Sequence, residues 1–419
     1  MSYRELFANR EFSSLFVADG LSMVGTYLSR LAVSALVFAR SDSVTLTALA
    51  FAISYAPYVF SPLLSSFSDR FAGRPLLVTC DLARAGLMLL VAIPGQLYSV
   101  MLVVLFLVGV LRIPFGASRL SLLADILTKE QFPSGNALVS SARQTLQVAG
   151  FAIGGVIITI VGTQPAIIFD AATFAVSGLI IIAFVKPRPA AWTGRPVEVG
   201  DSEQRRPPSV RQGMVEGLRV VTGTPRMQWL LVLMCLGPAS LVVSEGVAVP
   251  FAHQLGDGTT LAGIVMAAPP VGTVVGLLVY GRLAPEVQRR YSVPLALMGA
   301  LGVALAGVVA LKVSWIPATV IVLGLAGTSL AYLNALQAEI AAVIPAHLRG
   351  RAFGLANSAL QLSQGGAIII AGLIAESIRV PETLIAMGVV FAGAVVVAGI
   401  RLNDSPPGLV ELSATDESD

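Results

Sequence analysis

Ionisable and polar side chains recur along one face of the apolar segment 13–38. Asp19, Met23, Thr26 and Arg30 follow one another at helical spacing, so a carboxylate, a thioether, a hydroxyl and a guanidinium share one stripe. An ionisable side chain inside a membrane segment is expensive to bury and is therefore a functional candidate. The stripe predicts a water-filled path in which the carboxyl group exchanges protons.

Two carboxylates are candidate proton carriers. Partial desolvation favours the protonated form of a carboxyl group, and on this ground Asp19 is the first candidate and Glu245, in the run 228–252, is the second. Arg112 lies in an apolar run as well, where it must face a cavity and find an anion. A static ion pair of Asp19 with Arg112 or Arg30 is the alternative, and for Glu245 the alternative is a hydrated position at the rim.

Uncharged amides recur at helical spacing on two further apolar segments. Such amides can hydrogen-bond a substrate without fixing its charge, while aromatic and thioether groups supply apolar surface. Hydrogen bonding between helices alone, at about 0.6 kcal/mol per pair, is the alternative role. The candidate substrate cavity is lined by Met23, Arg30, Tyr58, Phe115, Gln144, Gln147, Phe151, Asn357, Gln361 and Gln364.

Two other carboxylates are not expected to couple protons. Asp170 falls near the start of a predicted helix, which favours a helix-end role. Glu339 falls near the end of another predicted helix and is expected to pair with Arg349 or Arg351 in a gate.

The composition shows which solvent surrounds the chain. Of its 419 residues 55% are hydrophobic and only 12% are charged, about half of the charged fraction that is usual in soluble proteins. The mean hydropathy is +0.82. These values predict a protein embedded in a lipid bilayer and exclude a soluble enzyme.

Metal and cofactor chemistry lacks its residues. The two histidines, His253 and His347, do not form an HExxH motif, and the two cysteines do not form a CxxC pair. None of the three lysines follows a glycine, so a P-loop is absent from the sequence. We expect no cofactor, no enzymatic activity and no nucleic-acid partner.

Apolar runs that end at glycine, proline or charged residues predict a bundle of transmembrane helices. Each run approaches the roughly 20 residues that cross a bilayer. The runs are too long for buried strands and lack the alternation of a membrane barrel. The twelve predicted spans are 13–38, 45–67, 76–94, 98–122, 136–161, 165–185, 228–252, 259–281, 292–313, 315–343, 352–375 and 382–402.

The basic residues predict the orientation of these spans. Most of the 27 lysine and arginine residues fall in loops on the side of the N-terminus, and few fall in the loops opposite. Because lysine and arginine accumulate in cytoplasmic loops, both termini are expected in the cytoplasm and the protein in the cell membrane.

The chain divides into two similar halves. We predict a six-helix bundle over 1–185, a polar cytoplasmic linker over 186–226, a second six-helix bundle over 227–402 and a disordered tail over 403–419. Duplicated halves are common in secondary transporters, which bind their substrates between the halves near the middle of the membrane.

The segment 65–74, SSFSDRFAGR, resembles the signature of the major facilitator superfamily, Gly-x-x-x-Asp-Arg-x-Gly-Arg-[Arg/Lys]. Asp69, Arg70 and Arg74 keep their positions, whereas both glycines and the first of the paired basic residues are replaced. The resemblance covers essentially the whole chain and implies an all-α fold of two pseudo-symmetric six-helix bundles. It also implies that these three residues, with Arg290 in the equivalent loop of the second half, form a conformational latch.

Other motifs are similar to those of an efflux-type branch of the superfamily. Arg112-x-x-x-Gly116 resembles a membrane-embedded arginine motif with a role in proton coupling. Residues 150–155, GFAIGG, resemble the antiporter signature Gly-Pro-x-x-Gly-Gly, with Phe151 in place of proline. Packing of small residues between helices is the alternative role of this segment. The branch exports drugs, antibiotics or siderophores.

The sequence thus favours a monomeric transporter that exports a small, largely apolar molecule in exchange for protons by alternating access. In this hypothesis protonation of Asp19 or Glu245 releases its hold on Arg112. Uptake of a small nutrient, by proton symport or by facilitated diffusion, is the first alternative. A transporter-like receptor that moves no solute is the second.

Overall fold

The computed structural model describes residues 3–68, 71–188, 218, 223–256, 258–313, 315–344 and 349–405. Within them, twelve helical stretches are long and apolar enough to cross a membrane, which confirms the predicted all-α architecture. The elements are α1 (Tyr3–Ala8), α2 (Arg10–Ser41), α3 (Val44–Ala52), η1 (Ile53–Phe60), α4 (Ser61–Ser68), α5 (Gly73–Ala92), α6 (Tyr98–Ile126), α7 (Phe132–Val161), α8 (Thr163–Phe184), α11 (Pro225–Gly246), α12 (Ala248–Gln254), α13 (Thr259–Tyr280), α14 (Pro285–Arg290), α15 (Ser292–Lys312), α16 (Ile316–Gly327), η2 (Thr328–Ala331), α17 (Tyr332–Val343), α18 (Arg349–Ser377) and α19 (Val380–Asn403).

Two of the spans change from α-helix to 3₁₀-helix near their middle. The second span consists of α3, η1 and α4, and Pro57 lies inside η1, where its missing N–H interrupts the α-helical hydrogen bonds. The tenth span consists of α16, η2 and α17 and contains no proline at its break. There the backbone of Gly327 packs so closely on Pro269 that a Cβ would lie 2.1 Å from the Pro269 carbonyl oxygen.

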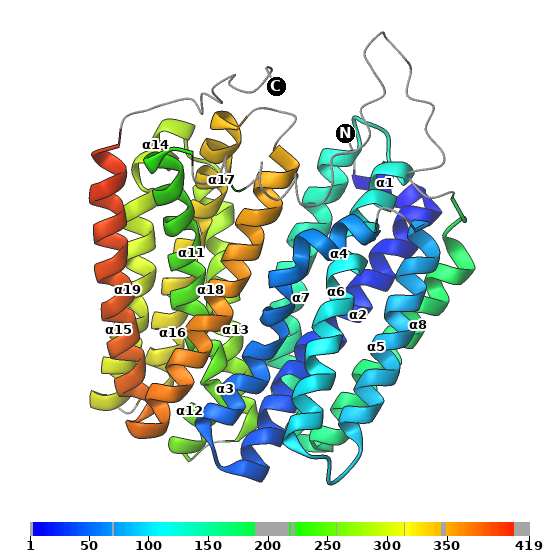
Figure 1. The fold of residues 1–419 in the computed structure, drawn as a ribbon. Coiled ribbons are helices and arrows are strands. Elements are labelled where there is room, and N and C mark those ends of the chain that lie inside the picture. The colour runs from blue at the N-terminus through cyan, green and yellow to red at the C-terminus, as the bar shows by residue number, and fades with distance from the viewer. Residues whose placement is uncertain are drawn as a thin grey trace, which may run out of the picture.

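The helices pack into two groups (Figure 1). In the first half, α2 packs on α7 and α8, and α5 packs on α6 and α8. In the second half, α11 packs on α18 and α19, and α15 packs on α16 and α19. The predicted linker 186–226 and tail 403–419 lie largely outside the described residues.

The halves meet at one end of the molecule and diverge toward the other (Figure 1). The end that carries α1 and the last turn of α19 is the terminal end, and the other is the opposite end. Several hydrogen bonds join the halves at the opposite end, among them those between Thr159 and Thr259 at 2.8 Å and between Thr45 and Glu376 at 2.7 Å. One apolar core crosses both halves, whereas the cores nearer the terminal end stay within a single half.

Close glycine contacts explain this junction. Gly155 of α7 faces Gly263 of α13, and Gly372 of α18 faces Ala48 of α3. Without a side chain at these glycines the helix backbones approach each other directly, as is common between membrane helices. The molecule is therefore closed at the opposite end.

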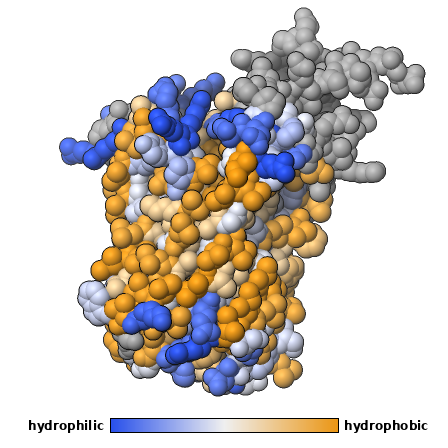
Figure 2. Space-filling view, turned by 90° about the vertical axis from the view of Figure 1, so that its left-hand side faces the viewer, coloured by the Kyte–Doolittle hydropathy of each residue, from blue (hydrophilic) through white to orange (hydrophobic). Residues whose placement is uncertain are grey.

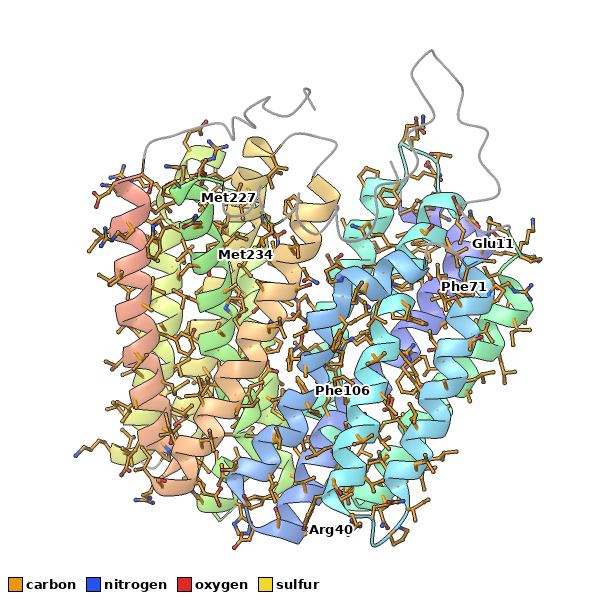
Figure 3. The ribbon with its side chains drawn as sticks, viewed as in Figure 1. Glu11, Arg40, Phe71, Phe106, Met227 and Met234 are labelled. Atoms are coloured by element: carbon orange, nitrogen blue, oxygen red, sulfur yellow. The ribbon has the colours of Figure 1, made fainter. Side chains whose placement is uncertain are left out.

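The outer surface fits a lipid environment. Figure 2 shows that hydrophobic side chains cover the middle of one face, with hydrophilic ones near its two ends. Large apolar side chains such as Ile160, Leu179 and Val390 are exposed by 76%, 60% and 66%. Figure 3 places Glu11 and Arg40 at the two ends of α2, so the long apolar stretch between them spans this band. The chain is a multi-pass membrane protein.

Candidate translocation cavity

A central cavity of about 220 Å³ lies between the halves. In the first half it is lined by α2, η1, α6 and α7, and in the second half by α11, α13, η2 and α18. The two 3₁₀ segments contribute Tyr55 and Leu330, so both breaks in the spans face this space. The lining consists of Tyr27, Arg30, Tyr55, Arg112, Gln144, Gln147, Pro238, Leu241, Val242, Glu245, Pro269, Pro270, Thr273, Leu330, Gln361 and Gln364.

The structure brings the two predicted amide stripes together. Gln144 and Gln147 face the cavity from α7, and Gln361 and Gln364 face it from α18. The Gln364 amide nitrogen donates to the Gln361 side-chain oxygen at 2.9 Å and to the Leu360 carbonyl oxygen at 3.3 Å. This leaves the Gln364 side-chain oxygen and the Gln361 amide nitrogen for a ligand. Asn357, a turn nearer the terminal end, is exposed and does not line the cavity.

Three charged side chains face the cavity, two positive and one negative. Glu245 is 9% exposed, and Arg30 is the charged group that acts on it electrostatically. Arg112 lies near tyrosine side chains of η1 and α2. Within the described residues none of these three groups forms an ion pair, so the cavity carries an excess of positive charge.

Asp19 occupies a different place from the one the sequence favoured. Its carboxylate forms ion pairs with Arg119 of α6 at 2.9 Å and with Arg143 of α7 at 3.4 Å, and its side chain is 5% exposed. The predicted pairing of Asp19 with Arg112 or Arg30 is therefore wrong. Arg112 and Arg119 lie seven residues apart on one face of α6, and helical spacing alone does not show which of them the carboxylate meets.

The predicted apolar residues of the substrate cavity lie elsewhere. Phe115 is buried within the first half, where its ring centroid lies 4.2 Å from the Arg84 guanidinium. Phe151 is fully buried and packs edge-on against Tyr27 at 5.2 Å. Met23 lines a separate, smaller pocket, described below.

Tyr58 is half-buried and lies near Arg112, outside the cavity lining. Tyr27 and Tyr55 line the cavity instead. The sequence reasoning missed both residues. Tyr55 lies in η1, which has about 3.0 residues per turn instead of 3.6, so the exposed face of this span shifts from the one that α-helical spacing predicts.

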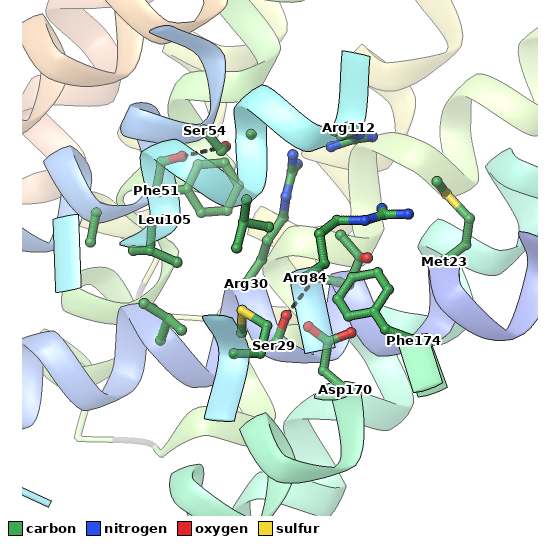
Figure 4. Close-up of a pocket in the computed structure, with 16 residues that line it drawn as sticks. Met23, Ser29, Arg30, Phe51, Ser54, Arg84, Leu105, Arg112, Asp170 and Phe174 are labelled. Atoms are coloured by element: carbon green, nitrogen blue, oxygen red, sulfur yellow. Dashed lines mark hydrogen bonds between the residues drawn. The ribbon is translucent and has the colours of Figure 1, made fainter. Parts of the chain in front are cut away.

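A buried polar cluster occupies the first half (Figure 4). Arg84 forms an ion pair with Asp81, and the Ser177 hydroxyl donates to the other Asp81 oxygen at 2.7 Å. Asp170 is only 1% exposed and faces the same pocket, so the predicted helix-end role is wrong for this residue. Asp81 and Arg84, three residues apart in an apolar run, are the signal that could have revealed the cluster.

The predicted latch is described in part. Asp69 and Arg70 lie outside the described residues. Arg74 donates to the carbonyl oxygen of Ile182 at 2.5 Å, which ties α5 to α8, and Arg290 is exposed on α14.

Glu339, the predicted gate carboxylate, forms an ion pair in the described part of the chain. Glu339 pairs with Arg226 at 2.5 Å and so joins α17 to the start of α11. The side chains of the expected partners, Arg349 and Arg351, lie outside the described residues.

Comparison with known proteins identifies the family. The model of the Major Facilitator Superfamily matches residues 15–367 and 246–418. This chain belongs to the Major Facilitator Superfamily. A Bacillus subtilis (strain 168) relative, the uncharacterized MFS-type transporter YkuC, is 30% identical over 208 residues, which are 47% of this chain and 48% of the relative. The match thus spans about half the length of that protein.

Solved structures share the superfamily fold. The nucleoside transporter NupG aligns with a TM-score of 0.72 at 12% identity, over 94% of this chain and 98% of NupG. A bacterial homolog of the human lysosomal transporter Spinster, in an inward-facing and occupied conformation, aligns at 0.71 and 13% identity, over 95% and 98%. A POT family transporter in complex with a thioalcohol-conjugated peptide aligns at 0.71 and 11%, over 94% and 96%. The protein is a membrane transporter of the superfamily and not an enzyme.

Proposed function

We propose that this superfamily member is a proton-linked secondary transporter of a small organic anion. The observation that supports this proposal is the central cavity, where Arg30 and Arg112 face a single carboxylate, Glu245. A buried charge needs a partner in a low-dielectric site, so the second guanidinium favours a ligand with a carboxylate or phosphate group. The cavity is also smaller than the roughly 300–1,000 Å³ of pockets for drug-sized ligands, which favours a small solute.

Glu245 links the anion to protons. While ionised, Glu245 offsets part of the positive charge of Arg30, and protonation of Glu245 leaves that guanidinium available to an anion. The proton and the anion therefore strengthen each other's binding, since linkage is reciprocal. Two ligands that favour each other cross in the same direction, so this arrangement favours proton symport, and an inward proton gradient then drives uptake.

Export of a largely apolar molecule in exchange for protons is the second candidate. The observation that favours it is the packing of the segment that resembles the antiporter signature. A Cβ on Gly150 would lie 2.6 Å from Cβ of Tyr27, and Gly155 contacts Gly263 across the halves. A cationic, otherwise apolar solute would compete with the proton at Glu245, and such competition is the condition for antiport.

In the proposed orientation the terminal end faces the cytoplasm. Basic residues gather near that end, among them Arg74, Arg188, Arg226 and Arg290, and cytoplasmic loops are enriched in such residues. The protein then lies in the cell membrane with both termini inside, and it works as a monomer because the cavity is built from one chain. Closure at the opposite end leaves the cytoplasmic side as the route to the cavity in this state.

Flux into proteoliposomes with an acidic exterior tests this proposal. The solutes are a panel of small carboxylates and organic phosphates, with lipophilic dyes as the comparison. Accumulation of an anion that stops with a protonophore is expected for the unmodified protein. Glu245→Gln is expected to keep anion exchange but lose the response to the gradient, whereas the exposed Glu286→Gln serves as a matched control with unchanged transport.

Arg30→Gln measures the anion contact. Loss of a charged hydrogen bond of about 1.5–3 kcal/mol predicts a rise in KM of about 10- to 150-fold. Gradient-driven movement of dyes, without movement of any anion, would instead support proton-linked export. Absence of all flux would overturn both candidates.

A further inference from the structure

A second carboxylate faces Arg30 from within its own half. A pocket of about 60 Å³ lies inside the first half, separate from the central cavity (Figure 4). Arg30 and Arg112 line both spaces. Asp170 of α8 lines only the inner pocket and is 1% exposed. Arg30 thus lines one space with each of two carboxylates, Asp170 in the inner pocket and Glu245 in the central cavity.

Asp170 is held by hydroxyl groups and has no ion pair in the described part of the chain. The Thr173 hydroxyl oxygen lies 3.5 Å from its Oδ1 atom, and the Ser29 hydroxyl also contacts the carboxylate. Across from it, Gly25 of α2 leaves room for this carboxylate, since a Cβ there would lie 2.5 Å from Oδ1. A buried carboxylate in such a site either takes up a proton or draws in a cation.

Three guanidinium groups face the inner pocket, and one of them is fixed. Arg84 of α5 is bound by Asp81, and its guanidinium lies 4.2 Å and 4.5 Å from the ring centroids of Phe115 and Phe174. These three contacts hold Arg84 in place. It is therefore the least able of the three to follow a change of charge on Asp170.

Arg30 is held by weaker contacts than Arg84. Arg30 forms no ion pair among the described residues. Its guanidinium lies 5.6 Å and 5.5 Å from the ring centroids of Phe51 and Tyr55, and it also contacts the Tyr55 hydroxyl. Aromatic faces bind a cation without fixing its direction of hydrogen bonding. Arg84 is the stronger electrostatic neighbour of Asp170, and Arg30 is the guanidinium that acts on both Asp170 and Glu245.

We infer that Arg30 is a counter-ion shared by Asp170 and Glu245, and that Asp170 is a second proton-binding site of this transporter. Each carboxylate is ionised while Arg30 lies beside it and binds a proton from the aqueous cavity when Arg30 leaves. Movement of Arg30 toward Asp170 withdraws a positive charge from the central cavity. A bound anion is then released, and this consequence for transport rests on the proposed function.

Infrared difference spectroscopy of the purified full-length protein tests the inference without any transport. The titration records protonated carboxyl bands as a function of pH. The band of Glu245 is identified by its loss in Glu245→Gln, and that of Asp170 by its loss in Asp170→Asn. In Asp170→Asn the cation Arg30 has only one partner left, so the Glu245 band is expected to appear at a pH lower by about 1–3 units.

Three comparisons decide the result. Asp81→Asn removes a carboxylate that binds Arg84 and is expected to leave the Glu245 band in place. The shift caused by Asp170→Asn is expected to disappear in an Arg30→Gln background and to persist in an Arg112→Gln background. An unchanged Glu245 band in Asp170→Asn overturns the inference, and so does a shift that persists without Arg30. The shift in Asp170→Asn alone is decisive if the arginine variants fail to fold.

Failure of the proposed function gives a different result. If no anion is transported but the Glu245 band shifts as described, the shared counter-ion stands and the substrate class is wrong. If anion transport depends on the proton gradient but the band does not shift, the proposed function stands and Asp170 is not a second proton site.

Discussion

Replacement of Gly155 by alanine tests whether the contact between α7 and α13 keeps the opposite end closed. An added Cβ would lie 2.7 Å from the Thr259 carbonyl oxygen and 3.1 Å from the Cα atoms of Thr260 and Gly263. All of these are backbone atoms of the other half, so no side chain can turn aside. The clash exists only while the halves are in contact at this end.

The size of the effect follows from the cost of overpacking. Insertion of a methyl group into a close-packed contact costs about 1–3 kcal/mol, which corresponds to a shift of about 5- to 150-fold in a conformational equilibrium. Alanine also favours the helix over glycine by up to about 1 kcal/mol. That gain acts on α7 in both conformations and cancels. Gly155→Ala is therefore expected to favour opening at the opposite end.

Spin labels at the terminal end provide the measurement. Ser140 and Asn357 are exposed on α7 and α18, one in each half, so a pair of labels there reports the separation of the halves by double electron–electron resonance. Closure of the terminal end, which accompanies opening of the opposite end, shortens this distance. Gly366→Ala is the matched control, because a Cβ at Gly366 meets no atom within 4 Å.

The reasoning would be refuted if the population of the conformation that is open at the opposite end differed by less than about twofold between Gly155→Ala and Gly366→Ala. In that case the clash is absorbed by small backbone shifts, and the glycine contact does not hold the closed state. A shift in the opposite direction would also refute it, because it would mean that the added methyl group strengthens the junction.

Two further substitutions separate a structural ion pair from a conformational contact. Asp19→Asn leaves Arg119 and Arg143 without their carboxylate, and loss of one partner of a buried pair costs about 3–5 kcal/mol, so we expect a lower melting temperature in thermal unfolding of the detergent-solubilised protein. If the variant instead has the melting temperature of the unmodified protein and its transport no longer depends on pH, the result would support Asp19 as the proton carrier. Glu376→Gln weakens the acceptor of the hydrogen bond from the Thr45 N–H group. A charge at a helix N-terminus contributes about 0.3–1 kcal/mol, so the conformational equilibrium is expected to shift toward opening of the opposite end by less than about fivefold. The same pair of spin labels measures this shift. A shift larger than that of Gly155→Ala would contradict the ranking of these two contacts.

The sequence shows which helices carry polar faces because polar groups are rare in membrane spans. Gln144 and Gln147 of α7, and Gln361 and Gln364 of α18, stand out from apolar neighbours at helical spacing, and they do meet in one cavity. Arg30 and Glu245 stand out in the same way and lie in the same place. For these residues a single physical rule suffices, since a polar group that faces neither lipid nor an apolar core must face water or a ligand.

Apolar residues carry no such signal. Phe115 and Phe151 were predicted in the cavity, yet both lie within packed helix contacts. Lipid tails and a packed protein interior are equally apolar, so an apolar side chain does not indicate which way its helix face points. Only the rotation of each helix against its neighbours decides this, and that rotation depends on glycine contacts such as the one between Gly150 and Tyr27.

The sequence by itself determined the membrane setting, the twelve spans and the rare polar side chains that build the cavity, because each of these depends on composition and on spacing along one helix. Tertiary structure alone decided which charges meet. Asp19 pairs with Arg119 rather than Arg112, and Arg30 lines one pocket with Asp170 and the central cavity with Glu245. Which charged groups pair depends on distances of a few ångströms between helices, and the position of a residue along one helix does not specify those distances.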